Sequence, residues 1–106
     1  MMTTIDEALA TAAWWKFPLE RARIIFRGRY VADPRLSYRE IGLATGVSGP
    51  RIRQNEERIL RILRHPRNRI IAANIDNERL MLAIFGADWQ RYREATIEGR
   101  DNAKNT

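Results

Sequence analysis

Helix caps and helix stops alternate between residues 37 and 66, and they constrain the fold of this chain more than any other feature. They are a capping box at Ser37 and Glu40, a left-handed stop at Gly46, an N-cap at Ser48 and a stop at His65-Pro66. These signals predict a short helix, a glycine turn and a longer helix. The apolar positions expected to lock the two helices together are Ile41, Ala44, Val47 and Ile52. The pattern is typical of a helix-turn-helix.

The residues before this motif also predict helices. Thr4 and Glu7 fit a capping box, and the first helix should end near Lys16. Pro18 suits the first turn of a second helix. Gly28 and the pair Asp33-Pro34 should mark the end of that helix and a loop.

The residues after the motif continue the helical pattern. An apolar segment at 70–75 and a helix at 77–85 that stops at Gly86 should precede a last helix from Asp88 to about Glu98. No stretch alternates apolar and polar residues for long enough to predict a strand. We therefore expect an all-α fold with extra C-terminal helices. Its expected parts are an N-terminal helix at 1–16, the helix-turn-helix domain at 17–66, a helical extension at 67–98 and a flexible tail at 99–106.

The positive charge is concentrated in the middle of the chain. The formal net charge is +6, and all but two of the 19 basic residues are arginines. Residues 16–69 hold 14 basic and five acidic residues, a balance of +9. Such a balance favours a polyanionic partner.

The second helix of the motif separates an apolar face from an arginine-rich face. At about 100° per residue, its isoleucines and leucines fall on one half of the helix. The other half holds Arg51, Arg53, Gln54, Glu57, Arg58, Arg61 and Arg64. Because arginine binds phosphate and guanine with two hydrogen bonds at once, this face predicts contact with double-stranded DNA. Arg53 and Gln54, near the start of the helix, are the expected base contacts, and Arg58, Arg61 and Arg64 the expected phosphate contacts.

The stretch LSYREIGLATGVSGPRIRQNEERILRILRHP, residues 36–66, resembles the final helix-turn-helix of housekeeping sigma factors of bacterial RNA polymerase. The shared pieces are EIG, GVS, the RIRQ-x-E start of the second helix and its LR-x-LRHP end, and LERARIIFRGRY upstream is also similar. The resemblance implies that the second helix reads a promoter element. It also implies docking on the flap of the polymerase β subunit through an apolar surface of the earlier helices. The implied DNA contacts are Arg51, Arg53 and Gln54, with Ser37 and Arg39 near the DNA backbone.

Three departures from the family pattern limit what the resemblance implies. Gly49-Pro50 replaces the usual Arg-Glu at the start of the second helix, and Asn55 replaces an apolar residue. A chain of 106 residues also has no room for the domain that melts promoter DNA, so we expect something other than a complete sigma factor. The promoter sequence read by the family need not be the sequence read by this chain.

Two apolar groups are candidate contacts with a protein partner. Aromatic residues anchor many interfaces, so an aromatic cluster and the following helix could bind a partner or pack in the core. These residues are Trp14, Trp15, Phe17, Ile25 and Phe26. Residues 80–89 are apolar nearly all round, and they could cover the motif or join subunits of a homo-oligomer.

Composition argues against an enzyme and against a bound cofactor. The chain has no cysteine and a single histidine, His65, which we interpret as a helix-end residue and not as a metal ligand. Glu56 lies on the core side of its helix, and we expect it to be a buried or bridging salt-bridge partner of a group on the first helix of the motif, and not a catalytic acid. Neither a signal peptide nor a membrane-spanning stretch is visible, so we expect a cytoplasmic protein with no membrane partner.

Three functions are compatible with these observations. The first is a small transcription regulator of a phage or mobile element, which binds promoter DNA, RNA polymerase or both. The second is a DNA-packaging subunit that oligomerises through residues 80–89, similar to a terminase small subunit. The third is a decoy that imitates the sigma domain and occupies an anti-sigma factor or the flap without binding DNA, a reading motivated by Gly49-Pro50.

Overall fold

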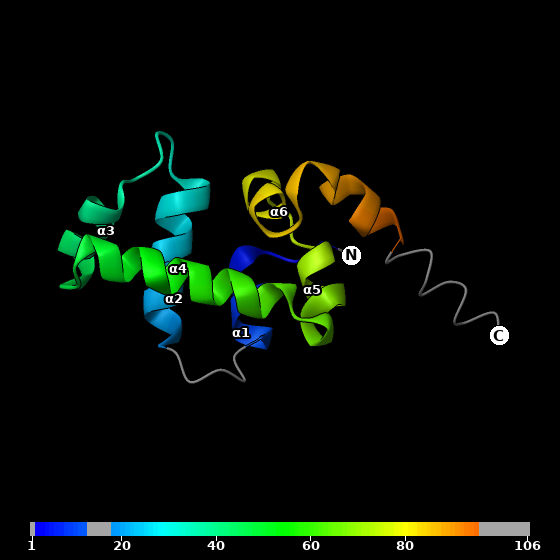
Figure 1. Cartoon of the computed structure of the whole chain (residues 1–106), viewed down its shortest axis with the longest axis horizontal. Coiled ribbons are helices and arrows are strands. Elements are labelled where there is room, and N and C mark those ends of the chain that lie inside the picture. The colour runs from blue at the N-terminus through cyan, green and yellow to red at the C-terminus, as the bar shows by residue number, and fades with distance from the viewer. Residues whose placement is uncertain (1, 13–17, 96–106) are drawn as a thin grey trace.

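The computed structural model describes residues 2–12 and 18–95, and this part of the chain is helical with no strand (Figure 1). Its α-helices are α1 (Ile5–Thr11), α2 (Leu19–Phe26), α3 (Tyr38–Thr45), α4 (Gly49–Arg64), α5 (Arg69–Ala73) and α6 (Glu78–Phe85). A π-helical segment, η1 (Arg27–Val31), extends α2, and 3-10 turns lie at η2 (Pro66–Asn68) and η3 (Gly86–Asp88). Residues 89–95 form a further helical segment. The expected all-α fold is confirmed, and no described helix is long and apolar enough to cross a membrane.

The predicted caps of the helix-turn-helix are present in α3 and α4. Ser37 Oγ accepts a hydrogen bond from the Glu40 amide at 3.0 Å, and the Ser37 amide donates to Glu40 Oε1 at 3.2 Å. Gly46 ends α3 with a φ of 73°, and Ser48 Oγ accepts from the Arg51 amide at 3.3 Å. The caps fix where each helix starts, so the turn between them has little freedom.

The close approach of α3 to the turn depends on Gly42. A Cβ atom at Gly42 would lie 2.3 Å from the carbonyl oxygen of Val47, which no side chain tolerates. Ile41 and Ile52 are buried as expected, whereas the prediction that Ala44 joins the helices is wrong, because Ala44 is exposed. Ala44 lies about 160° from Gly42 around the helix, so it faces away from α4.

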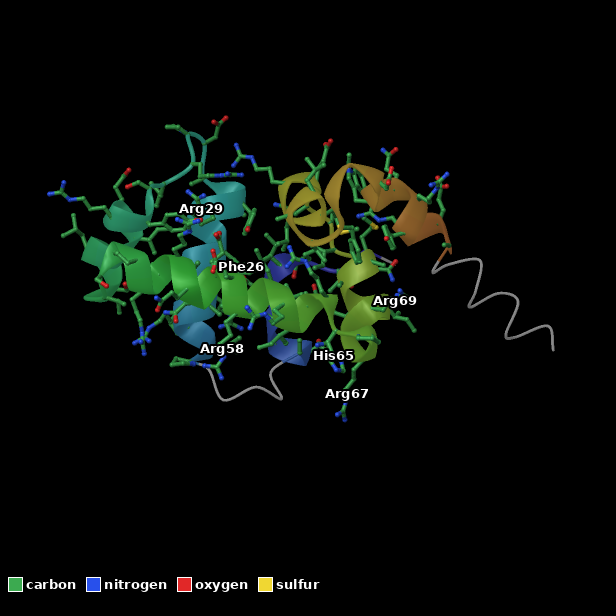
Figure 2. All side chains as sticks on the ribbon, viewed as in Figure 1. Phe26, Arg29, Arg58, His65, Arg67 and Arg69 are labelled. Carbon is green, nitrogen blue, oxygen red and sulfur yellow. The ribbon has the colours of Figure 1, made fainter. Side chains whose placement is uncertain are left out.

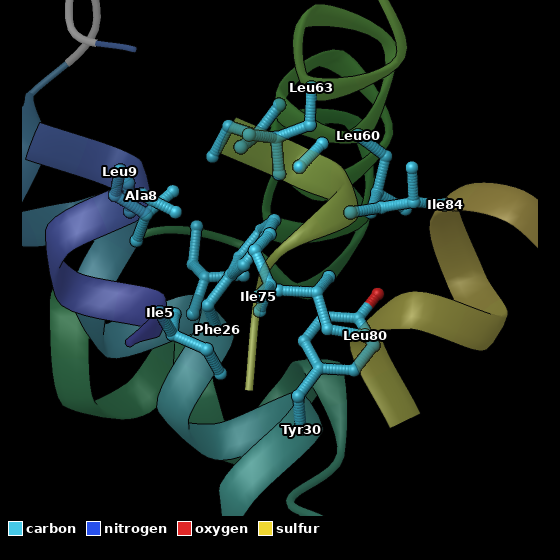
Figure 3. Close-up of a cluster of buried hydrophobic side chains, with 14 of the residues drawn as sticks. Ile5, Ala8, Leu9, Phe26, Tyr30, Leu60, Leu63, Ile75, Leu80 and Ile84 are labelled. Atoms are coloured by element: carbon cyan, nitrogen blue, oxygen red, sulfur yellow. The ribbon is translucent and has the colours of Figure 1, made fainter. Parts of the chain in front are cut away.

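One apolar core joins α1, the helix-turn-helix and the C-terminal helices. Figure 3 shows side chains of α1, α2, α4 and α6 meeting in this cluster. Backbone hydrogen bonds of 2.7 Å, from the Thr3 amide to Asn74 and from the Asp76 amide to Thr3, hold the N-terminal segment beside Ile75. Arg79 Nη1 also donates to the Ala32 carbonyl at 2.7 Å, so α6 is tied to the loop before α3.

The buried side chains overturn one predicted partner surface. Ile25 and Phe26 are fully buried, because α1 covers this face of α2 and contributes Ile5 and Leu9 to the same core. They are core residues and cannot form an exposed docking surface. Trp14, Trp15 and Phe17, the other members of that set, lie outside the described residues.

Two predicted helix boundaries are also wrong. The first helix ends at Thr11 and not near Lys16, because Ala12 leaves helical geometry with a ψ of 10°. Gly28 does not end the second helix: it lies inside η1 and is buried where a Cβ atom would meet Ile41 Cδ1 at 2.9 Å. The missing side chain therefore serves packing of α3 against η1, and not a turn.

The predicted apolar stretch 80–89 is used largely within the chain. Leu80, Met81 and Ile84 of α6 are buried in the common core, while Leu82 is exposed. These three residues therefore pack against the motif, which is one of the two roles expected for this stretch.

Replacing Gly42 by alanine should lower the free energy of unfolding by about 1 to 3 kcal/mol, because the new methyl group must displace the Val47 carbonyl. Urea unfolding followed by circular dichroism measures the change. Ala44→Ser, on the exposed side of α3, is the matched control and should stay within about 0.5 kcal/mol of the parent. Equal stability of the two variants would contradict the close approach at Gly42.

Candidate nucleic-acid interface

The first turns of α3 and α4 lie against each other and form a shallow groove. A Cβ atom at Gly49 would meet the backbone nitrogen of Arg39 at 3.4 Å, so the two helix starts are in contact. The groove is lined by Tyr38, Arg39, Gly49, Pro50, Arg53, Gln54 and Glu57. Helix N-termini carry a partial positive charge and free amide donors, which attract anions.

The structure brings three predicted DNA contacts together in this groove. Arg39 comes from α3, and Arg53 and Gln54 come from α4; all three are exposed. Ser37 lies one position before α3, where its hydroxyl accepts the capping hydrogen bond. The remaining predicted contacts do not line the groove.

Three of the other four predicted contacts extend the basic surface along α4. Arg51, Arg58 and Arg61 are exposed, and none of them pairs with an acidic side chain within residues 2–12 and 18–95. Figure 2 shows Arg58 on the side of α4 away from α6. The arginine-rich face is therefore divided between the groove and an exposed flank.

Arg64 is the exception on that face. Its Nε donates to the Ile84 carbonyl at 2.9 Å, and its Nη2 donates to the Ala83 carbonyl at 2.7 Å. These are carbonyls of the last turn of α6, which have no partner within their own helix. The prediction that Arg64 contacts phosphate is thus corrected: its guanidinium caps α6.

A buried carboxylate fixes the position of α3 relative to α4. Tyr38 donates from its hydroxyl to Glu56 Oε1 at 2.6 Å, and Arg29 Nε donates to Glu56 Oε2 at 3.3 Å. The side chains of Arg29 and Glu56 are 16% and 7% exposed, so water screens this pair little. Glu56 bonds the first helix of the motif through the Tyr38 hydroxyl, but the salt bridge expected with that helix is not found among the described residues. The ion pair with Arg29 of η1 is a further contact.

Arg29 also holds Tyr38 directly. Its guanidinium lies over the Tyr38 ring, 4.1 Å from the centroid, and its Nη1 donates to the Leu36 carbonyl at 3.0 Å. Burial, followed by the neighbouring Glu56, raises the pKa of both Tyr30 and Tyr38 above the ordinary value. Tyr38 therefore keeps its proton at neutral pH and remains a donor to the carboxylate.

Sequence reasoning assigned no role to Arg29 or Tyr38. Arg29 is one of many arginines, and only the fold shows that it meets a carboxylate 27 residues away. The sequence pattern places Glu57 on the arginine face and indicates no function for it. In the structure Glu57 lines the groove, and its Oε1 accepts a hydrogen bond from Arg53 Nε at 3.3 Å. Asn55, which replaces an apolar residue of the family pattern, is 8% exposed, and its Nδ2 has no hydrogen-bond partner among the described residues.

Ligands for a metal ion do not gather anywhere in the described part of the chain. No group of three His, Asp or Glu side chains is suitably placed within residues 2–12 and 18–95. His65 is the residue before η2, where its Nδ1 accepts a hydrogen bond from the Arg67 amide at 3.1 Å. His65 thus acts as a helix-end residue, as expected.

The family comparison matches the elements that build the groove. Residues 20–65 match the family "Sigma-70, region 4". These residues form a sigma-70 region 4 domain. The match begins in α2 and ends at His65, directly after α4, so it contains η1, α3, the turn and α4. No curated protein and no solved structure matches this chain.

The match to region 4 supports a DNA-binding regulatory role for residues 20–65. Region 4 is a DNA-binding regulatory helix-turn-helix domain and not a catalytic one, and such domains typically bind DNA and RNA polymerase. α1, α5 and α6 lie outside the matched residues, yet they complete the core of the region 4 domain.

Tyr38→Phe should lower the free energy of unfolding by about 1.5 to 3 kcal/mol, because it removes a hydrogen bond to a buried charge. The phenylalanine ring can keep its place under Arg29, so the effect isolates the hydroxyl. Urea unfolding at neutral pH measures it. In a Glu56→Gln background the same substitution should cost less, and an equal cost in both backgrounds would contradict a hydrogen bond from Tyr38 to the Glu56 carboxylate.

Proposed function

We propose that this chain is a transcription regulator that uses its region 4 domain to bind promoter DNA. The observation that carries the proposal is the groove at the starts of α3 and α4, with Arg39, Arg53 and Gln54 around it. The phage or mobile-element origin stays a prediction from the sequence alone.

The chemistry of the groove suits a DNA duplex. The start of α4 would enter the major groove, where arginine can donate to guanine O6 and N7 and glutamine can bond adenine. Arg53 and Gln54 have the matching side chains at the matching end of the helix. Ser37 and Arg39, at the start of α3, would bond the adjacent DNA backbone.

The exposed flank of α4 would carry the phosphate contacts. Arg51, Arg58 and Arg61 have no acidic partner in the described ranges, so their charge is available to a polyanion. These contacts would supply affinity without sequence preference. The groove would thus supply sequence specificity, and the exposed flank of α4 would supply affinity for any duplex.

Gly49-Pro50 points to a target that differs from the usual promoter element. Both residues line the groove, where they offer neither a charge nor a side-chain hydrogen bond. Pro50 fits the first turn of α4, so the helix keeps its geometry while two side-chain contacts are absent. The base preference would therefore depend on Arg53, Gln54 and Glu57.

RNA polymerase is the proposed protein partner, because region 4 domains typically bind it. The contact cannot use Ile25 and Phe26, which are buried. Co-purification of the tagged chain with RNA polymerase, or with the isolated β flap, tests this part. Recovery of neither would remove polymerase from the proposal and leave DNA binding to be judged separately.

The two alternative functions make different predictions in the same assays. A packaging subunit should form a ring of many copies by light scattering, although the apolar residues Leu80, Met81 and Ile84 are already buried within the chain. A decoy should bind no duplex at near-physiological salt. A monomer or dimer that binds duplex DNA would reject both.

Arg61→Ala should weaken binding of all duplexes by a similar factor, because it removes a phosphate contact. The slope of log affinity against log salt should become shallower by about 0.9. Arg53→Ala should instead reduce the preference for the best site. Fluorescence anisotropy with labelled duplexes across a salt series measures both effects.

Arg91→Ala, an exposed charge in the helical segment 89–95, is the matched control and should leave the preference unchanged. If Arg53→Ala and Arg91→Ala behave alike, α4 does not read DNA. Absence of salt-dependent duplex binding by the parent chain would refute the proposal itself.

A further inference from the structure

Glu57 is an unexpected residue in a groove proposed to face DNA. It is the single acidic side chain among the described residues that line the groove. A carboxylate there repels phosphates and weakens binding to every duplex. Tighter binding to DNA therefore cannot explain why Glu57 lies in the groove. A role in choosing between DNA sequences can explain it.

Helix stability is a weak explanation for the Arg53–Glu57 pair. The two side chains are 66% and 55% exposed, and ion pairs this exposed contribute little to stability. An acidic residue four positions after a basic one is also the less favourable order in a helix. Arg61 offers the favourable order to Glu57, yet within the described chain Glu57 pairs with Arg53.

The hydrogen bond leaves the reading end of Arg53 available. Arg53 donates from Nε to Glu57 Oε1 at 3.3 Å, which leaves Nη1 and Nη2 without a partner among the described residues. Two donors side by side match O6 and N7 of guanine. Without Glu57, the long exposed side chain of Arg53 would lose rotamer freedom when it binds a base. It could also turn to a phosphate, a contact that carries no sequence information.

We propose that Glu57 is a positioning residue that holds Arg53 for recognition of a guanine. The inference rests on the proposed DNA-binding function and adds a base and a mechanism to it. Glu57 lowers affinity for all duplexes through its charge and raises the preference for duplexes with guanine at one position through Arg53.

The test begins with selection of preferred duplexes from a random library by the parent chain. Dissociation constants are then measured for the selected site and for variants in which each guanine is replaced by adenine. The parent should prefer guanine at one position by about 5- to 150-fold, the range of one good two-bond contact. Arg53→Ala should abolish that preference.

Variants of Glu57 separate positioning from charge. Glu57→Ala should lose most of the guanine preference while binding other duplexes more tightly, and Glu57→Gln, which can still accept from Nε, should fall between Glu57→Ala and the parent. In the Arg53→Ala background, which should have no guanine preference, Glu57→Ala should have no further effect on the preference. Glu94→Gln removes the same charge in the segment 89–95, which lies at the far end of the molecule from α3 (Figure 1), and it should not alter the preference.

Three results would overturn the inference, and they bear differently on the proposed function. If both Glu57 variants tighten binding to all duplexes equally and keep the guanine preference, Glu57 acts through charge alone and DNA binding stands. If the parent binds duplexes without a guanine preference, the inference falls and DNA binding again stands. If the parent binds no duplex, the inference and the proposed function fall together.

Discussion

The buried carboxylate of Glu56 is the constraint on which the geometry of the helix-turn-helix depends. It lies on α4, and it bonds Tyr38 of α3 and Arg29 of η1. A carboxylate this buried is costly without partners, so the three elements are strongly favoured in one arrangement. That arrangement places the first turns of α3 and α4 in contact, which creates the groove. Tyr38 both donates to the buried Glu56 carboxylate and lines the groove, so the same side chain stabilises the fold and shapes the candidate site.

The segments outside the region 4 match are part of the same folded unit. α1 covers Phe26, α6 contributes Leu80 and Met81 to the core, and Arg64 of α4 caps α6. These contacts use side chains that could otherwise face a partner or DNA. The additional helices therefore restrict the surfaces that remain for binding, and they leave the groove and the exposed flank of α4 open.

Local signals in the sequence predicted much of the fold. The caps at Ser37 and Ser48 and the stops at Gly46 and His65-Pro66 depend on neighbouring residues alone, so the bounds of α3 and α4 could be predicted closely. The exposed arginine face of α4 follows from helical periodicity in the same way. Long-range contacts could not be predicted: the sequence does not show that Arg64 reaches α6 or that Arg29 meets Glu56. The apolar pattern of Ile25 and Phe26 is the same whether their helix faces a protein partner or is covered by α1.

Duplex DNA is proposed to bind at the groove between the starts of α3 and α4. The most direct test of this binding is a titration of the labelled chain with a duplex, followed by nuclear magnetic resonance of the backbone amides. The amides that shift most should belong to residues 37–40 and 49–61, with little change in α1, α6 and the segment 89–95. Shifts centred on α6 or on α1, with the groove amides unchanged, would contradict binding at the groove.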